Sequence, residues 1–541
     1  MAELPALLVS GDLFASATNL NGRRWVSQQL LRLWAAACGS DPLHLLTASA
    51  ADLETLRPQL QQAGHSGALI HLPIHQPAAC QAAGSVLIAD PSIASWARWR
   101  QAAGPASFSL IGQIHTLSTT AAIAHLEALA HQPLHPWDAL VCSSSAGRAV
   151  VEALLEEREA FLAERYGGSR KRARRQRPQL PVIPLPVPVG DLIAALPDRQ
   201  QARAALGLPA DAHVLVWLGR LSMLTKADPW PTYALLQQLA GELDRPLILI
   251  EVGPNDTPEQ GAHFEQLRQL APDVGFLRLG GDTAVPESQK RQALAAADVA
   301  ISLVDNIQET FGLAVVEAMA AGLPVLASDW DGYRDLIQQG EQGWLVPSRW
   351  SSCASAASFP LGWSQAAGWH EYPFCAGALA QLVQLDLHSA LSQLRSLLSQ
   401  PERARAMGQR GRQWALSHCD APVVMEHYAA LHCSLAHQRA KAKQRQHEPA
   451  TAPLGLNPVR LFGHYPSHAP AQNPDQPLTL SQLSAIPEAV RQGRRGLWQP
   501  LTEWLPEAQQ LQLRQALQAK HAPPQDVSHS TKRSQDPWLP R

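Results

Sequence analysis

Two glutamates stand eight positions apart around a Phe-Gly step, in the stretch ETFGLAVVEAMAAGLPVLASD (residues 309–329). Gly312 has no side chain, so the backbone there can approach a ligand closely, and the free N–H groups of a helix starting at this point can bind an anion such as a diphosphate. Glu317 could accept two hydrogen bonds from a ribose diol, and Glu309 would face the other end of the ligand. Alternatively, both are solvent-exposed residues at helix ends. The pair alone leaves both interpretations open.

Two cations precede the glutamates in the stretch WLGRLSMLTKAD. Arg220 comes at the end of an expected strand, and Lys226 follows six residues later on the next loop. Arginine supplies a planar fork and lysine a point charge, and both would stabilise a nucleotide diphosphate that departs with growing negative charge. A surface lysine and a helix-pairing arginine are the alternative. The coincidence with the glutamates favours a site for a nucleotide diphosphate.

These residues lie in the second of two α/β domains that the hydropathy pattern predicts. Short apolar runs alternate with helical stretches from residue 5 to about 188, and the alternation restarts after a basic loop and a proline-rich connection. We expect two doubly wound, Rossmann-like parallel sheets, in an N-terminal domain of residues 1–189 and a C-terminal domain of residues 190–435. Ligands of open α/β sheets bind beyond the carboxyl ends of the strands, so the expected site is a cleft between the domains.

The rest of the chain departs from this alternation. Residues 347–376 are rich in Ser, Ala, Gly and Trp and lose periodicity, which predicts an inserted surface loop. Helices up to about residue 435 are expected to close the second domain. Residues 436–541 are expected to form a linker, a small helical segment and a disordered tail.

Composition excludes several classes of function. The formal net charge is -2, so no global basic field points to nucleic acid as a partner. Seven scattered cysteines without a C-x-x-C pair indicate a reducing compartment, and the absence of a signal-like segment or a run of ~18 apolar residues favours a cytoplasmic protein. No metal-binding spacing and no G-x-G-x-x-G motif occurs, so neither a metal site nor a dinucleotide oxidoreductase is predicted.

The order of these motifs resembles a known family. The segments GRLS-x-x-x-K, LRLG and AAADVAISLVDNIQETFGLAVVEAMAAGLPVLASDWDGYRDLI are similar, in order and spacing, to those of the retaining glycosyltransferases of family 4 (glycosyl transferases group 1), which have the GT-B fold. The resemblance covers roughly residues 1–435 and is strongest over residues 214–346. It implies a nucleotide-sugar donor held by the second domain and an acceptor held by the first.

The resemblance also implies roles for individual residues of the second domain. Arg220 and Lys226 match the ligands of the diphosphate, Glu317 the ligand of the ribose, and Glu309 the glutamate that contacts the transferred sugar. The remaining implied contacts are made by backbone, at the strand end FLRLG that would meet the base and at the loop that would meet sugar and phosphate: Leu279, Phe311, Gly312 and Leu313.

Two residues of the first domain complete the implied site. His115, in IGQIHTLST, matches a cleft histidine near the sugar, although a histidine satisfied within the core is the alternative. Gly22, in NLNGRR, matches the glycine loop at the diphosphate, but Asn21 stands where the family usually has a second glycine. The hinge IPLPVPVG and the segment DNIQET depart from the family pattern as well.

The expected function is a retaining transfer of a hexose from a UDP-, GDP- or ADP-sugar to a glycan or lipid-linked acceptor, as in the synthesis of cell-envelope polysaccharide. Front-face substitution without a metal or a bound cofactor is the expected mechanism, with the departing phosphate taking the acceptor proton. A nucleotide-sugar epimerase or phosphorylase of the same fold, or a non-catalytic nucleotide-sugar binding protein, remains an alternative.

Six basic residues between positions 170 and 177 form a further feature: Arg170, Lys171, Arg172, Arg174, Arg175 and Arg177. Such a cluster is usually a solvated loop. In the acceptor-side domain it is also a candidate for peripheral contact with an anionic membrane surface at the inner face of the membrane.

Overall fold

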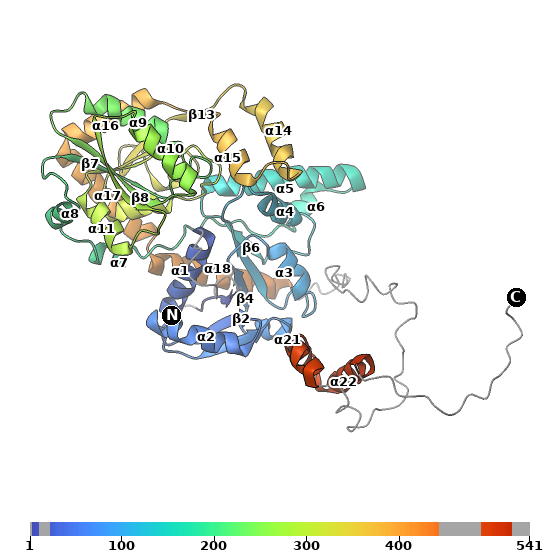
Figure 1. Ribbon diagram of the computed structural model, residues 1–541. Helices are drawn as coiled ribbons and strands as arrows, with labels where there is room; N and C mark the ends of the chain where they lie inside the picture. Colours follow the sequence, from blue (N-terminus) through green and yellow to red (C-terminus); the bar gives the residue numbers. More distant parts are fainter. Residues whose placement is uncertain (1–2, 10–21, 443–487, 522–541) are drawn as a thin grey trace, which may run out of the picture. The chain divides into compact units, whose positions relative to one another are not determined.

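The computed structural model describes residues 3–9, 22–442 and 488–521 of the chain (Figure 1). The chain divides into two compact units, residues 1–455 and 456–541. The first unit contains both predicted α/β domains.

The first domain is built on a six-stranded parallel sheet with the order β3-β2-β1-β4-β5-β6. Its strands are short and largely buried, as expected when helices cover both faces of a parallel sheet. They are β1 (Ala6–Leu8), β2 (Leu43–Thr47), β3 (Leu69–Pro73), β4 (Ser85–Ile88), β5 (Ser109–Gln113) and β6 (Ala139–Val141). The connecting helices are α1 (Gly22–Cys38), α2 (Ala50–Gln62), the 3-10 helix η3 (Pro77–Gln81), α3 (Ile93–Arg100), α4 (Thr120–Ala128) and α5 (Ser145–Tyr166).

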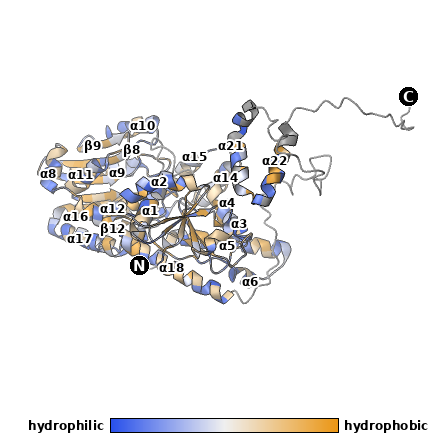
Figure 2. Ribbon diagram, turned by 90° about the horizontal axis from the view of Figure 1, so that it is seen from below, coloured by the Kyte–Doolittle hydropathy of each residue, from blue (hydrophilic) through white to orange (hydrophobic). Residues whose placement is uncertain are grey.

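The second domain repeats this strand order, as β9-β8-β7-β10-β11-β12. Its strands are β7 (His213–Leu218), β8 (Leu247–Pro254), β9 (Val274–Gly281), β10 (Val299–Ser302), β11 (Val325–Ser328) and β12 (Gly343–Val346). Its helices are α7 (Val189–Ala194), α8 (Arg199–Ala205), α9 (Pro229–Ala240), α10 (Pro258–Arg268), α11 (Glu287–Ala296), α12 (Leu313–Ala320), α13 (Tyr333–Leu336), α16 (Leu387–Ser399) and α17 (Pro401–His418). Most helices carry both hydrophilic and hydrophobic residues, because one face covers a sheet and the other meets solvent (Figure 2).

Both sheets are therefore doubly wound, which confirms the predicted fold class. In each sheet the strand order reverses beside the first strand, at β1 and β4 in one domain and at β7 and β10 in the other. The connections on the two sides of such a switch point run in opposite directions and leave a crevice at the carboxyl ends of the strands.

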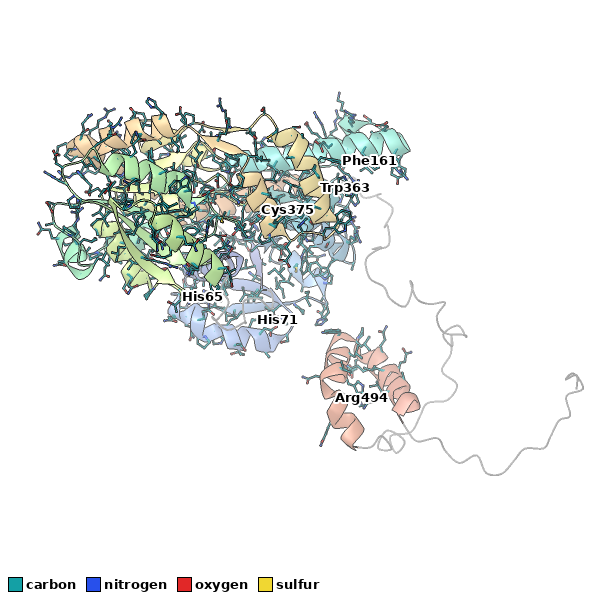
Figure 3. The ribbon with its side chains drawn as sticks, turned by 45° about the horizontal axis from the view of Figure 1, so that its top comes forward. His65, His71, Phe161, Trp363, Cys375 and Arg494 are labelled. Atoms are coloured by element: carbon teal, nitrogen blue, oxygen red, sulfur yellow. The ribbon has the colours of Figure 1, made fainter. Side chains whose placement is uncertain are left out.

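Residues 347–376, expected to form an irregular loop, are instead folded. The antiparallel strands β13 (Ser348–Trp350) and β14 (Val383–Leu385) frame the helices α14 (Ala354–Ala366) and α15 (Tyr372–Ala380). The two helices lie beside α4 and α5 of the first domain (Figure 1). Large aromatic side chains stay exposed here, among them Trp363, labelled in Figure 3, at 61% and Trp369 at 82%. Their exposure explains the lack of a periodic signal, and we call residues 348–385 the insertion.

Helix α18 (Ala421–Ala442) belongs to the first domain by its packing, although we expected the helices up to residue 435 to close the second. The Trp34 and Tyr428 rings meet edge to face at 5.3 Å. Five α18 residues join the same buried cluster as α1 and α2: Val424, Met425, Tyr428, Leu431 and Leu435. The chain returns to the first domain beside its first crossing, where Val187 bridges Asp420.

The basic segment forms the short helix α6 (Arg170–Arg174) after α5. Two of its six cations bind glutamates of α5, Arg174 to Glu156 at 2.7 Å and Arg177 to Glu159 at 2.5 Å. In the second unit the described residues form α21 (Glu488–Trp504) and α22 (Glu507–His521), a helical C-terminal region as expected. Among the described helices, none is both long and apolar enough to cross a bilayer.

Candidate active site

The switch point of the second sheet brings together the cations and the first glutamate that the sequence singled out. Arg220 and Lys226 lie on the loop after β7, and Glu309 lies on the loop after β10, the neighbouring strand. Lys226 Nζ and Glu309 Oε2 are 3.4 Å apart. The two loops are also joined directly, since Asn306 Nδ2 donates to the carbonyl of Leu224 at 2.9 Å. The fold therefore explains how positions far apart in sequence converge.

Glu309 is held as a carboxylate. Its Oε1 accepts the N–H groups of Thr310 at 3.2 Å and Phe311 at 3.4 Å. Burial raises the pKa of this carboxyl, but the charge of Lys226 and the two N–H groups outweigh that effect, so the pKa lies below its usual value. An ionised, oriented carboxylate beside a lysine can accept hydrogen bonds from sugar hydroxyls and balance developing positive charge.

Asp256 orients Arg220, although it is not among the site residues predicted from the sequence. Arg220 Nη1 donates to Asp256 Oδ1 at 2.6 Å, while Ser222 Oγ donates to Asp256 Oδ2 at 2.8 Å. Asp256 lies two residues after the end of β8, at the same edge of the sheet. The sequence did offer a signal for Asp256, because it is a carboxylate just beyond the carboxyl end of an expected strand.

Gly312, the predicted glycine at the start of α12, is also required by its backbone conformation and by packing. Gly312 has a φ of 110°, and a Cβ added to it would lie 2.6 Å from Tyr333 Cε1. The Phe311 side chain is buried in the core, so this residue could meet a ligand only through its backbone, whereas Leu313 is half-buried. No side chain of the described part of the chain caps this helix.

Glu317 lies on α12, and Lys290 of α11 donates to its Oε1 at 2.9 Å. The same lysine binds Glu287 at 2.9 Å. Burial lowers the pKa of Lys290, but the two glutamates outweigh this, and its pKa is raised. Lys290 thus orients the glutamate assigned to the ribose. No sequence signal marks it, because the pairing depends on how α11 packs beside α12.

The other predicted site residues lie on other strands, helices and loops. His115 follows β5 in the first domain, where its Nε2 lies 2.7 Å from the Ala89 carbonyl. Leu279 lies in β9, the edge strand, and packs against the core of the second domain. Gly22 begins α1, and the predicted glycine loop before it lies outside the described residues.

Contacts from the first domain reach the loop that carries Glu309. Ser118 Oγ donates to the Ile307 carbonyl and Ser143 Oγ to the Thr310 carbonyl, both at 3.3 Å. The insertion joins them, since Tyr372 Oη lies 2.9 Å from Ser118 Oγ. The crevice is therefore bounded by both domains and by the insertion.

A second carboxyl sits beside Glu309. Asp331 has a φ of 47°, the one positive value among the described residues other than glycine. Burial, together with the negative charge of Glu309, raises the pKa of Asp331 to about 8. At neutral pH this group is largely a neutral acid, which can donate a hydrogen bond that Glu309 cannot.

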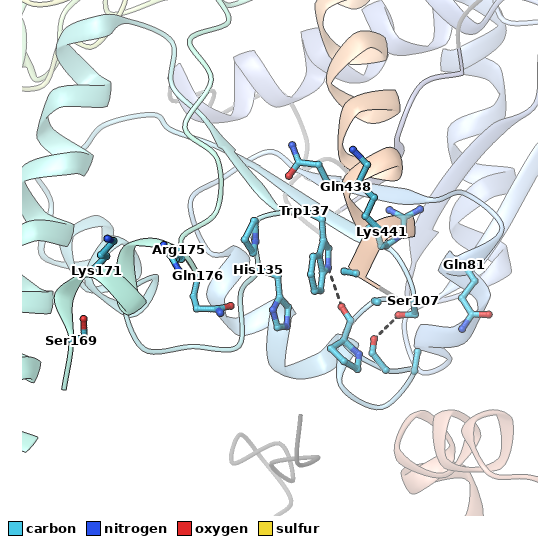
Figure 4. A pocket seen from close by; sticks show the side chains of 17 residues that line it. Gln81, Ser107, His135, Trp137, Ser169, Lys171, Arg175, Gln176, Gln438 and Lys441 are labelled. Carbon is cyan, nitrogen blue, oxygen red and sulfur yellow. Dashed lines mark hydrogen bonds between the residues drawn. The ribbon is translucent and has the colours of Figure 1, made fainter. Parts of the chain in front are cut away.

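A separate basic pocket opens at the other edge of the first sheet (Figure 4). Part of its lining directly precedes β4, β5 and β6, and the rest, from the segment after α5 and from α18, carries the cations Lys171, Arg175, Arg439 and Lys441. No aspartate or glutamate is among its described lining residues. Arg439 is half-buried and donates to Ser109 Oγ at 2.6 Å, and burial lowers its pKa. This surface favours anions but is remote from the switch point.

Two doubly wound domains facing a crevice at their switch points define the GT-B class of protein. Residues 212–358 match the family of glycosyl transferases group 1. The matched residues include Arg220, Lys226, Glu309 and Glu317 and end within α14.

Part of the chain is similar in sequence to D-inositol 3-phosphate glycosyltransferases. A D-inositol 3-phosphate glycosyltransferase of Nocardioides sp. (strain ATCC BAA-499 / JS614) is 36% identical over 156 residues, 28% of this chain and 34% of the relative. The protein of that name in Nocardia farcinica (strain IFM 10152) is 31% identical over 254 residues, 46% of this chain and 51% of the relative. The chain thus spans about a third to a half of the length of these relatives. A sucrose-phosphate synthase structure from Thermosynechococcus elongatus is 18% identical with a TM-score of 0.47, covering 81% of this chain and 100% of that structure.

Proposed function

We propose that this chain is a retaining glycosyltransferase that moves a hexose from a nucleotide diphosphate sugar to an acceptor hydroxyl. The observation that carries the proposal is the pairing of Lys226 with Glu309 at the switch point of the second sheet, with Arg220 on the same loop as Lys226, within the family match. The two cations would hold the diphosphate, and Glu309 would face the sugar.

The proposed step is a front-face substitution. The bond between the anomeric carbon and the diphosphate oxygen breaks, and the bond to the acceptor oxygen forms on the same face. The acceptor proton passes to the departing diphosphate, whose charge Arg220 and Lys226 offset. Lys226 and two backbone N–H groups already engage Glu309, which favours a binding and electrostatic role over that of a covalent nucleophile.

The acceptor is a glycan, a lipid-linked sugar or a small polyol phosphate. The names of the relatives suggest D-inositol 3-phosphate as one acceptor to test. Synthesis of a cell-envelope polysaccharide is the corresponding proposal for a glycan or lipid-linked acceptor, with a cytoplasmic protein working at the inner face of the membrane.

The test measures nucleotide release from UDP-, GDP- and ADP-sugars, alone, with D-inositol 3-phosphate and with a membrane lipid extract. We expect acceptor-dependent release by the wild type, lowered roughly 10²–10³-fold by Arg220→Ala and strongly by Glu309→Ala. The control is Arg403→Ala, which removes an exposed cation from α17. Sugar interconversion without an acceptor would indicate an epimerase, phosphate-dependent glycan breakdown a phosphorylase, and binding without release a non-catalytic protein.

We also propose that the basic pocket meets an anionic membrane surface. Because Arg174 and Arg177 bind α5, the contact would use Lys171 and Arg175 together with Arg439 and Lys441. Each cation near an anionic surface contributes about 1 kcal/mol. The double variant Lys171→Gln/Arg175→Gln should lower sedimentation with phosphatidylglycerol vesicles roughly 10- to 30-fold, and Arg403→Gln should not. Equal sedimentation of all three proteins would reject the contact.

A further inference from the structure

The insertion contributes a tyrosine to the crevice. Tyr372 is the first residue of α15 and lies beyond residue 358, where the family match ends. Its hydroxyl oxygen is 2.9 Å from Ser118 Oγ of the first domain and 3.4 Å from Gln308 Oε1, beside Glu309. One side chain of the insertion thus contacts both domains.

The position of Tyr372 is fixed by packing on both loops of the switch point. A Cβ added to Gly377 of α15 would lie 2.9 Å from Leu224 Cα, so the helix contacts the loop that carries Lys226. Asn306 Nδ2 reaches the carbonyls of Leu224 at 2.9 Å and Ala376 at 3.5 Å. Such close packing leaves α15 little freedom to move relative to these loops.

The insertion holds the first domain at a second point. Gln365 Nε2 of α14 donates to the Ser118 carbonyl at 3.0 Å and to Thr120 Oγ1 at 3.3 Å. Ser118 Oγ in turn donates to the Ile307 carbonyl. The Ser118 loop therefore forms a hydrogen-bond network with the insertion and the loop before Glu309.

The Tyr372 hydroxyl also faces the charged part of the crevice. Burial raises its pKa, while the Ser118 hydrogen bond and the positive charge of Arg220 act in the opposite direction. The phenol remains protonated at neutral pH and can donate a hydrogen bond to Ser118 or to Gln308.

We propose that Tyr372 is a positioning residue, whose hydroxyl holds the loop of residues 306–310 against the Ser118 loop and so fixes Glu309 beside the donor sugar. This inference rests on the proposed glycosyl transfer, because it assigns Tyr372 to the placement of the sugar rather than to the binding of the nucleotide. The insertion is then part of the working crevice.

The test compares Tyr372→Phe, which keeps the ring, with Tyr166→Phe, which removes an exposed hydroxyl from the end of α5. For Tyr372→Phe we expect kcat/KM for the nucleotide sugar to fall about 2- to 10-fold, as for loss of one neutral hydrogen bond. The Kd of the free nucleoside diphosphate, measured by calorimetry with UDP, GDP and ADP, should stay unchanged. Ser118→Ala should act alike, and the double variant should add little.

Hydrogen–deuterium exchange supplies a readout independent of turnover. In Tyr372→Phe we expect faster exchange in residues 114–120 and 303–311 and in no other part of the second domain. If the wild type turns over no nucleotide sugar, the proposed function fails, and exchange alone decides the role of Tyr372. If Tyr372→Phe matches Tyr166→Phe in exchange and in kcat/KM, or if it weakens nucleotide binding and lowers overall stability together, the inference is wrong.

Discussion

Two carboxyl groups of one crevice are driven to opposite protonation states. Glu309 meets a lysine and two N–H groups and stays ionised, whereas burial and the charge of Glu309 raise the pKa of Asp331 to about 8. Pairs of titratable groups whose surroundings separate their pKa values are typical of functional sites. A neutral acid at position 331 and a carboxylate at position 309 would offer a sugar both a donor and an acceptor.

The raised pKa of Asp331 predicts how stability depends on pH. In the unfolded chain Asp331 has the usual pKa of 3.8 and loses its proton above that pH, whereas in the folded protein it keeps the proton up to about pH 8. The free energy of unfolding therefore falls as pH rises from about 4 to about 8. Asp331→Asn removes this loss, and asparagine tolerates the positive φ. The Tm of the variant should equal that of the wild type near pH 4 and exceed it increasingly as pH rises to 9, by about 2–4 °C for each kcal/mol of added stability.

Thermal unfolding at pH 4, 6.5 and 9 measures this difference. The control is Asp211→Asn, at an exposed carboxyl of the same domain. A difference between Asp331→Asn and the wild type that is constant over this range would show that Asp331 titrates normally.

At the scale of elements, the insertion extends the second domain toward the first. Its helix α15 approaches the Leu224 loop closely at Gly377. This contact transmits any displacement of α15 to the loop that carries Lys226. A glycine without such a neighbour, Gly362 on α14, lies in the same insertion and has open space around it.

The two glycines make a matched pair of tests. Gly377→Ala should destabilise the protein by about 1–3 kcal/mol, because the new methyl group overlaps Leu224, and should weaken nucleotide binding. Gly362→Ala should stabilise by about 0.5–1 kcal/mol, since alanine is the better helix former. Chemical unfolding and calorimetry with UDP, GDP and ADP measure both effects. Equal behaviour of the two variants would mean that α15 does not rest on the Leu224 loop.

At the scale of the molecule, the chain crosses between the two domains twice, and both crossings lie side by side at Val187 and Asp420. The last described helix of the first unit, α18, packs on the first domain. Helix α18 covers the first sheet, and Tyr428 is buried against Trp34. The first domain thus depends on residues far from it in sequence. Its core is completed by a helix that follows the second domain in the chain.

Two variants of Tyr428 test this dependence. Tyr428→Ala should cost about 3–5 kcal/mol, as for other large aromatic residues truncated in a core. Tyr428→Phe should cost little or nothing, because the buried hydroxyl has no hydrogen-bond partner among the described residues. Unfolding monitored by tryptophan fluorescence and by circular dichroism measures both. A mild effect of Tyr428→Ala would show that α18 contributes little to the first core.

The sequence by itself determined the fold class and the position of the crevice. Apolar runs separated by helical stretches specify two parallel sheets, and the carboxyl ends of their strands attract ligands. Residue types near those ends, as in Arg220, Lys226 and Glu309, could therefore be chosen from one sequence. Their roles, and those of Glu317, His115, Leu279 and Gly22, stay predictions.

Only the tertiary structure decided which partners these residues have. Asp256, Lys290 and Tyr372 reach them from other elements, and no local pattern encodes such distances. The insertion was predicted as a surface loop, and its helices were missed because they expose aromatic side chains, which removes the apolar period. The place of α18 was missed because an amphipathic helix fits any apolar surface, and the return of the chain at Val187 and Asp420 chooses which one it covers.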